Sequence, residues 1–182
     1  MNLYEEIELT DECLNKALEY SKDRVYKRSM RGEEGTRVGA IGEAVLVDYL
    51  RDHSMEVIDK RESTRFDLLV NGKRVEVKTK DRTVAPKPFY ECSVPLYNHS
   101  HQIPDWFYFI SLYREGKVFK KAYLLGGMTY QQLSQEGVKM NKGEVDERNG
   151  WLCRESCINI NIEKLISNSM MLEILNDTQV HD

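Results

Sequence analysis

Two acidic residues and a lysine, Asp67, Glu76 and Lys78, form the group in this sequence whose side-chain types are best suited to chemistry. Glu76 and Lys78 are two positions apart, so on a β-strand their side chains leave the same face. Mg²⁺ and Mn²⁺ prefer oxygen ligands, and commonly take one or two carboxylates together with water and substrate phosphate. Such a metal activates water and stabilises charge on phosphoryl oxygens, while a neighbouring ammonium can orient either group. The three residues therefore indicate a metal-assisted reaction at a phosphate.

The Asn-Gly dipeptide at 71–72 determines how the two acids are placed. It is the strongest short signal for a β-hairpin, because both turn positions need positive φ. We expect strands over 66–70 and 73–80 on either side of it. With a two-residue loop the paired residue numbers keep a constant sum, so Asp67 would face Glu76. Opposed carboxylates on neighbouring strands repel each other, and a divalent cation would remove that repulsion.

Alternation along these two strands separates an apolar face from a polar face. Asp67, Glu76 and Lys78 share the polar face. The apolar face is formed by five hydrophobic residues, Phe66, Leu68, Val70, Val75 and Val77. This division is typical of a sheet that buries one side in a core.

A helix must precede the hairpin. The hydroxyl of Thr36 predicts a helix start, and apolar residues then recur at helical spacing to about Asp52. Gly39 and Gly42 inside this helix each cost about 1 kcal/mol relative to alanine, which suggests that another element approaches the backbone closely. Glu43 shares a face with apolar residues, so it is directed towards other protein groups and requires a partner.

The sequence resembles the PD-(D/E)XK nuclease superfamily over about 36–80. Four elements in order carry the resemblance: Gly42-Glu43 on the helix, Asp67 before the turn, Glu76 after it, and Lys78 two residues later. Phe66 stands where the proline that names the family would be. The resemblance implies an α/β, restriction-endonuclease-like fold, in which a mixed central β-sheet is flanked by α-helices.

The resemblance also implies a role for each matched residue. Asp67 and Glu76 would bind Mg²⁺, for which Mn²⁺ can substitute, and the main-chain carbonyl of Val77 would be a further ligand. Lys78 would assist the attacking water, and Glu43 would complete the site or serve a second metal. The implied activity is hydrolysis of phosphodiester bonds in DNA, as in restriction-like nucleases and in nucleases of phages and mobile elements.

Two other interpretations stay open. In the first, Asp67, Glu76 and Lys78 form a salt-bridge ladder on an exposed sheet face, which explains Lys78 but not Glu43. In the second, the chain is a module that keeps the nuclease fold and binds DNA or RNA without cutting it.

The charge distribution bears on a nucleic-acid partner. The formal net charge of −4 and the pI of about 5.7 give no whole-molecule attraction to a polyanion, so any basic surface must be local. Cations outnumber anions between Lys60 and Lys87, and such a surface would contact phosphates without reading sequence. The candidate DNA-contacting residues are Arg37, Lys73, Arg74, Lys80 and Arg82. A solvated sheet edge would explain the same charges.

The length of 182 residues favours one domain over 1–182, with a catalytic core at about 36–125. Further elements are expected as a first helix over 10–27, strands over 89–97, 106–113 and 118–125 that extend the sheet, helices over 130–134 and 163–175, and a frayed end over 176–182. No secretory signal or membrane-length apolar run is evident, so we expect a cytoplasmic protein. A homodimer would suit the cutting of both strands of a duplex.

Four cysteines, Cys13, Cys92, Cys153 and Cys157, are too few and too scattered for a disulfide scaffold, so reduced thiols are expected. Cys153 and Cys157 could form a zinc site with His99 and His101, although the spacing is not diagnostic. Ordinary loop histidines and buried thiols are the alternative.

Overall fold

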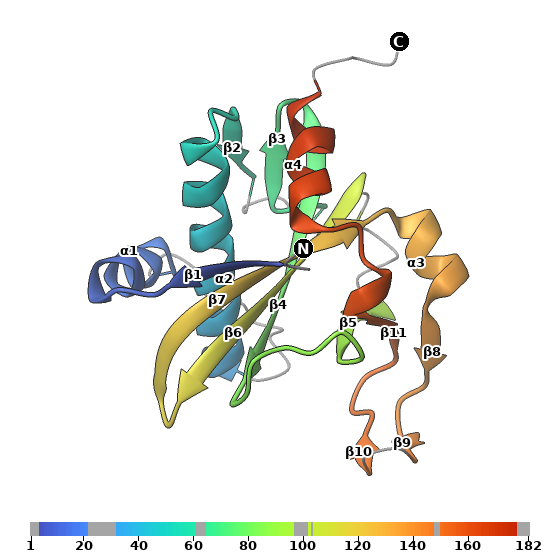
Figure 1. The fold of residues 1–182 in the computed structure, drawn as a ribbon. Coiled ribbons are helices and arrows are strands. Elements are labelled where there is room, and N and C mark those ends of the chain that lie inside the picture. The colour runs from blue at the N-terminus through green and yellow to red at the C-terminus, as the bar shows by residue number, and fades with distance from the viewer. Residues whose placement is uncertain are drawn as a thin grey trace.

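The computed structural model describes residues 4–21, 32–60, 65–96, 102, 104–147 and 150–177. Its largest element is a curled mixed sheet of six strands in the order β1-β7-β6-β4-β3-β2 (Figure 1). Its strands are β1 (Glu5–Glu8), β2 (Val57–Asp59), β3 (Leu68–Val70), β4 (Lys73–Arg82), β6 (Trp106–Glu115) and β7 (Val118–Met128). Neighbouring strands in this sheet are antiparallel, except for β4 and β6, which are parallel. The expectation of a mixed central sheet is confirmed.

A second sheet has the order β5-β11-β8, with β5 at Glu91–Pro95, β8 at Val138–Met140 and β11 at Cys157–Asn161. A small hairpin, β9 (Val145–Asp146) and β10 (Trp151–Leu152), lies between β8 and β11 in the chain. The prediction that the strand at 89–97 extends the main sheet is wrong, because β5 pairs with β11. Cys92 and Val94 of β5 pack in one cluster with Phe107 and Phe109. The second sheet thus covers a face of the main sheet.

The described residues contain four α-helices: α1 (Asp11–Ser21), α2 (Gly32–Asp52), α3 (Tyr130–Glu136) and α4 (Asn168–Asn176), with a 3₁₀ turn η2 at Ile162–Lys164. Thr10 precedes α1, where its Oγ1 accepts a hydrogen bond from the Cys13 N–H at 3.2 Å. The predicted end of this helix, near residue 27, lies outside the described residues. None of the described helices combines the length and the apolar character that crossing a bilayer requires.

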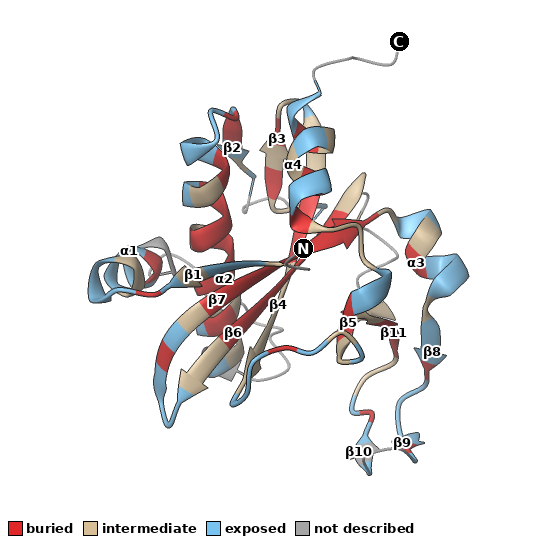
Figure 2. Cartoon of the chain, viewed as in Figure 1, coloured by how far each residue is buried: buried red, intermediate tan, exposed pale blue. Residues whose placement is uncertain are grey.

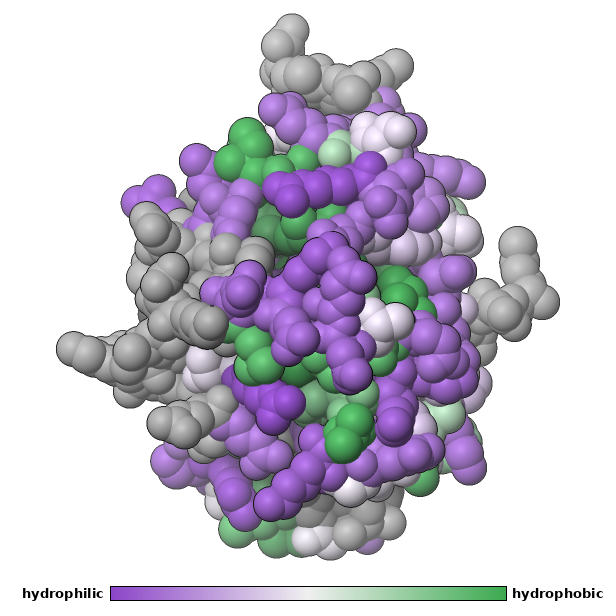
Figure 3. Space-filling model, turned by 90° about the vertical axis from the view of Figure 1, so that its left-hand side faces the viewer, coloured by the Kyte–Doolittle hydropathy of each residue, from purple (hydrophilic) through white to green (hydrophobic). Residues whose placement is uncertain are grey.

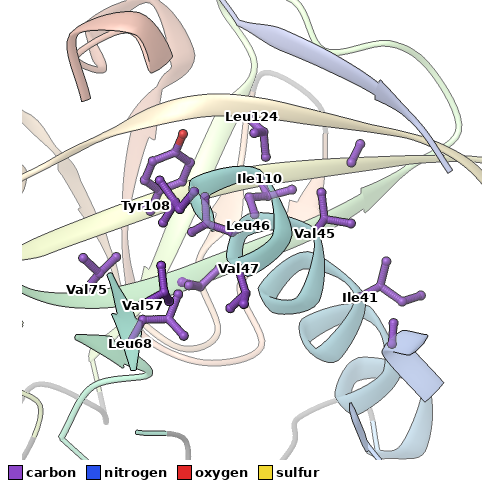
Figure 4. Packing of buried hydrophobic residues seen from close by; sticks show 14 of the residues in the cluster. Ile41, Val45, Leu46, Val47, Val57, Leu68, Val75, Tyr108, Ile110 and Leu124 are labelled. Atoms are coloured by element: carbon purple, nitrogen blue, oxygen red, sulfur yellow. The ribbon is translucent and has the colours of Figure 1, made fainter. Parts of the chain in front are cut away.

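Helix α2 begins four residues before the predicted start, so Thr36 lies inside the helix and is not its cap. The predicted end at Asp52 is confirmed. One side of α2 is buried against the main sheet (Figure 2). Figure 4 shows this packing, with Ile41, Val45 and Leu46 on the helix. The labelled residues of the sheet come from β2, β3, β4, β6 and β7, and they are Val57, Leu68, Val75, Tyr108, Ile110 and Leu124.

The surface on the side of α1 is mainly hydrophilic, and its hydrophobic residues form small separate groups (Figure 3). Hydrophobic side chains at 2% exposure or less fill the interior, with Leu46, Leu68 and Ile110 among them. One large hydrophobic cluster lies on each face of the main sheet: α2 and α4 pack on one face, and the second sheet with α3 packs on the other. A third, small cluster consists of Met140, Cys153 and Cys157.

The turn between β3 and β4 has the predicted geometry. Asn71 has φ of 45° and Gly72 has φ of 83°, and Leu68, Leu69 and Val70 pair with Val75, Arg74 and Lys73 in the predicted register. The Asn71 side chain accepts a bond from the Glu56 N–H at 2.9 Å and donates to the Leu175 carbonyl at 3.0 Å. Lys73 donates to the carbonyl of Asp177. The hairpin turn is thus tied to the end of α4.

Candidate active site

Asp67 lies where the two hairpin strands diverge. The regular pairing ends at Leu68 and Val75, so β3 starts two residues later than predicted and Asp67 is outside it. Its N–H donates to the Val75 carbonyl at 3.1 Å, and its Oδ2 accepts from the Val77 N–H at 2.8 Å. The Asp67 carboxylate therefore occupies a position at the edge of β4 that a strand partner would otherwise fill.

Glu76 and Lys78 lie in β4 and form an ion pair. The Lys78 Nζ donates to Glu76 Oε1 at 2.7 Å, and the two side chains are 15% and 5% exposed. Their register partners on β6 are Phe107 and Phe109, which are buried and leave the same face of the sheet. The pair is thus set among apolar groups, where electrostatic interactions are stronger than in water. This burial does not fit a salt-bridge ladder on an exposed sheet face.

Glu43 is positioned by the contact of α2 with β4. A Cβ added to Gly42 would lie 2.0 Å from Thr79 Oγ1, so the helix backbone approaches the strand as closely as glycine allows. Gly39 does not require glycine for packing, because a Cβ added there would have Glu43 Oε1 as its nearest neighbour, at 3.9 Å. Glu43 is 6% exposed and therefore buried. The predicted close approach is confirmed for Gly42, and it brings Glu43 beside the central part of β4.

The three acids influence one another electrostatically. Burial, followed by the nearby charges of Glu43 and Glu76, raises the pKa of the Asp67 carboxyl well above its ordinary value. Lys78 and the Val77 N–H act in the opposite direction but are weaker. Asp67 is thus close to both other carboxylates, although α2 packs on the face of β4 opposite to the one that carries Glu76. The groups meet around the edge of the strand.

The Val77 carbonyl points to the same edge. The Val75 carbonyl and the Val77 N–H both bond Asp67, so both of these residues direct their backbone polar groups towards β3. The N–H and C=O of one strand residue lie on the same side of the strand. The backbone of Val77 therefore directs its carbonyl oxygen to the edge of β4 at which the Asp67 carboxylate lies.

The chemistry of these donors fits a hard divalent cation. Three carboxylates and a carbonyl supply oxygen ligands alone, the type that Mg²⁺ and Mn²⁺ prefer. Across the described ranges, no three His, Cys, Asp or Glu side chains are arranged so that they could together hold a metal ion. Asp67 bonds the Val77 N–H and Glu76 bonds Lys78, so a cation would have to replace these donors. The donor set fits the metal, although its geometry is not preformed.

Gln102 contacts the site and has no signal in the sequence that would identify it. Its Nε2 donates to Glu76 Oε1 at 2.6 Å, across 26 positions of sequence. The contact depends on where the chain returns to pair β6 with β4, which neither residue spacing nor periodicity reports.

Four of the five candidate DNA-contacting residues donate hydrogen bonds within the chain. Arg74 makes two side-chain bonds to Asp105, the shorter at 2.5 Å. Lys80 and Arg82 both donate to the Glu91 carbonyl, at 3.3 and 2.8 Å. Their bonds within the chain give these three cations structural roles. Lys73 donates a hydrogen bond to the Asp177 carbonyl. Arg37 is exposed on α2, and its Cζ atom lies 5.7 Å from the centre of the Phe119 ring.

All four cysteines are free thiols, as expected. Cys153 and Cys157 are buried with their Sγ atoms 3.9 Å apart, so the structure brings together one half of the predicted zinc site. His99 and His101 lie outside the described residues, and zinc binding stays a prediction.

Comparison of the chain with protein-family models, with curated proteins and with solved structures gives no match. The geometry of the site is therefore the basis for inferring a function. Its groups come from α2, from the bend before β3 and from β4, and they meet at one edge of β4.

Proposed function

We propose that this chain is a Mg²⁺-dependent nuclease of the PD-(D/E)XK type, with a restriction-endonuclease-like domain that hydrolyses phosphodiester bonds in DNA. One observation carries the proposal: the buried carboxylates of Glu43 and Glu76 both lie near the partly buried carboxylate of Asp67, with Lys78 paired to Glu76. Carboxylates that are buried together are unfavourable unless a positive partner neutralises them. A divalent cation between Asp67 and Glu76 would supply such a positive partner.

Each residue of the site has a separate role in the proposed reaction. Asp67, Glu76 and the Val77 carbonyl would hold the cation, with Glu43 beside them. When bound, the cation lowers the pKa of a coordinated water and stabilises charge that develops on the phosphate. Lys78 exchanges its bond to Glu76 for one to the attacking water or to a phosphate oxygen. Buried Phe107 beneath the pair limits access of water, which strengthens each of these interactions.

DNA is proposed as the substrate because of the family resemblance, and the phosphate chemistry of the site supports either nucleic acid. A chain that binds nucleic acid without cutting it is the alternative. The two functions differ in one measurement, the appearance of cut product.

The test incubates purified protein with supercoiled plasmid, branched DNA and single strands, with and without Mg²⁺. Wild type should cut at least one substrate when the metal is present. Glu76→Ala and Lys78→Ala should each lower the rate by about 100-fold or more, the usual cost of losing one group that stabilises transition-state charge. Glu163→Ala and Lys117→Ala remove exposed groups of the same types and serve as matched controls.

Three results would count against the enzyme. Binding of every substrate without cutting would favour the inactive module. If the protein neither binds nor cuts any substrate, the three acids have a structural role. Cutting that survives in Glu76→Ala would place the reaction elsewhere in the molecule.

A further inference from the structure

Gln102 shares one carboxylate oxygen with the lysine of the site. Glu76 Oε1 accepts from Gln102 Nε2 at 2.6 Å and from Lys78 Nζ at 2.7 Å. The other oxygen, Glu76 Oε2, is buried and has no hydrogen-bond partner among the described residues. Glu76 is therefore held through one oxygen, and its second oxygen is left for another positive group.

The orientation of the Gln102 amide follows from its partner. A carboxylate accepts hydrogen bonds and cannot donate them, so the amide nitrogen must face Glu76. The Gln102 Oε1 then points away from that carboxylate, and it too is buried with no partner among the described residues. Gln102 thus supplies a neutral donor directed at Glu76.

The two donors on Glu76 differ in charge, which gives them different uses. Lys78 is the cation that the site offers to a phosphate or to the attacking water. If Lys78 alone held Glu76, its departure would leave a buried carboxylate oxygen without a partner, and such a loss is costly. A neutral amide does not compete for the phosphate, so it can stay in place.

We propose that Gln102 is a positioning residue that holds Glu76 Oε1 while Lys78 leaves it for the substrate. The inference rests on the proposed nuclease function and adds a residue that acts through Glu76. With Gln102 in place, Glu76 keeps Oε2 directed to the cation throughout the reaction. Without it, Lys78 stays paired with Glu76, and the chemical step slows while DNA binding is retained.

The test compares Gln102→Met, which keeps the length of the side chain and removes the donor, with Gln131→Met, which alters an exposed glutamine of α3. Initial rates are measured against DNA concentration at saturating Mg²⁺, and Mg²⁺ binding is measured by calorimetry without DNA. Gln102→Met should lower kcat by about 10- to 100-fold, the usual effect of losing a group that orients a metal ligand. KM for DNA should stay within about threefold of wild type, and Mg²⁺ affinity should fall.

A second variant keeps the proposal open to refutation if Gln102→Met folds poorly. Gln102→Glu keeps the shape of the side chain and replaces the donor by a negative charge, so without metal it should lower the melting temperature, and Mg²⁺ should restore part of the loss. Gln131→Glu should show neither effect. Wild-type rates in Gln102→Met, or a fall confined to DNA affinity, would overturn the role of Gln102 while leaving the nuclease intact. A wild type that neither takes up Mg²⁺ nor cuts would overturn both proposals together.

Discussion

At the scale of single residues, the charge of the Asp67 carboxylate is expected to lower the stability of the folded chain. Asp67 is partly buried and lies near two other acids, and its bond from the Val77 N–H only partly compensates. Such a group is unfavourable in the folded chain unless it binds a proton or a cation. Residues that are poor for stability but suited to a reaction are expected where a fold carries its function.

Asp67→Asn should therefore stabilise the chain when metal is absent. The pKa of Asp67 is raised above its ordinary value of 3.8, so the folded state binds more protons and stability falls as pH rises through the folded pKa. Asparagine carries no charge and can still accept from the Val77 N–H. In EDTA at pH 8 the melting temperature should rise by roughly 2–4 °C or more, the shift that 1 kcal/mol gives at this size.

The gain should shrink as pH is lowered and should disappear well below 3.8, where the carboxyl is protonated in both the folded and the unfolded chain. Cutting with Mg²⁺ should be lost in the same variant. Thermal melts at several pH values check the first point and plasmid assays the second. A variant that melts lower than wild type at pH 8 would contradict the proposed electrostatic cost.

The placement of Glu76 and Lys78 in β4 could be predicted from the sequence, whereas Asp67 lies outside the paired strand in which it was expected to face Glu76. The Asn71 turn sets the register, and alternation along β4 then places the side chains. Gln102 could not be found in this way. Its contact with Glu76 depends on the parallel pairing of β4 with β6, which is set by the whole sheet.

At the scale of elements, the closest contact that positions the site is the crossing of α2 over β4. Gly42 lies against Thr79, and the next residue in the helix is Glu43. The sequence indicated this contact through an unexpected glycine, but it also gave Gly39 equal weight. The predicted start of α2 at Thr36 was wrong, because a hydroxyl residue gives the same local signal whether it caps a helix or lies inside one. The strand at β5 was found but wrongly paired, because its alternation reports burial and not which sheet buries it.

Gly42→Ala and Gly39→Ala should have opposite effects on stability. At 42 the new methyl group would meet Thr79 at 2.0 Å, so the free energy of unfolding should fall by about 1–3 kcal/mol. At 39 the nearest atom would be 3.9 Å away, so alanine should raise it by up to about 1 kcal/mol. Urea denaturation measures both values. Adding Thr79→Ala to Gly42→Ala should recover most of the loss, and full additivity of the two changes would refute the contact.

At the scale of the whole molecule, metal binding should be visible as stability. A cation that binds the folded chain and not the unfolded one raises the free energy of unfolding by about 1.4 kcal/mol at ten times its Kd. Wild type in such a Mg²⁺ concentration should melt about 3–6 °C higher than in EDTA. Glu76→Ala should lose this shift, and Glu163→Ala should keep it. Equal shifts in both variants would mean that Mg²⁺ binds elsewhere. Sedimentation of the same samples would report whether the homodimer expected from the sequence forms.

The bond between Asn71 and the Leu175 carbonyl joins positions 104 residues apart, and it has a consequence for the life of the chain. The hairpin that carries the acids gains this brace only after the chain has been synthesised through α4. A premature stop or a protease cut before α4 would leave every side chain of the candidate site in the product and still remove a hydrogen bond that holds the hairpin turn. Loss of α4 should thus loosen the candidate site without removing any of its side chains.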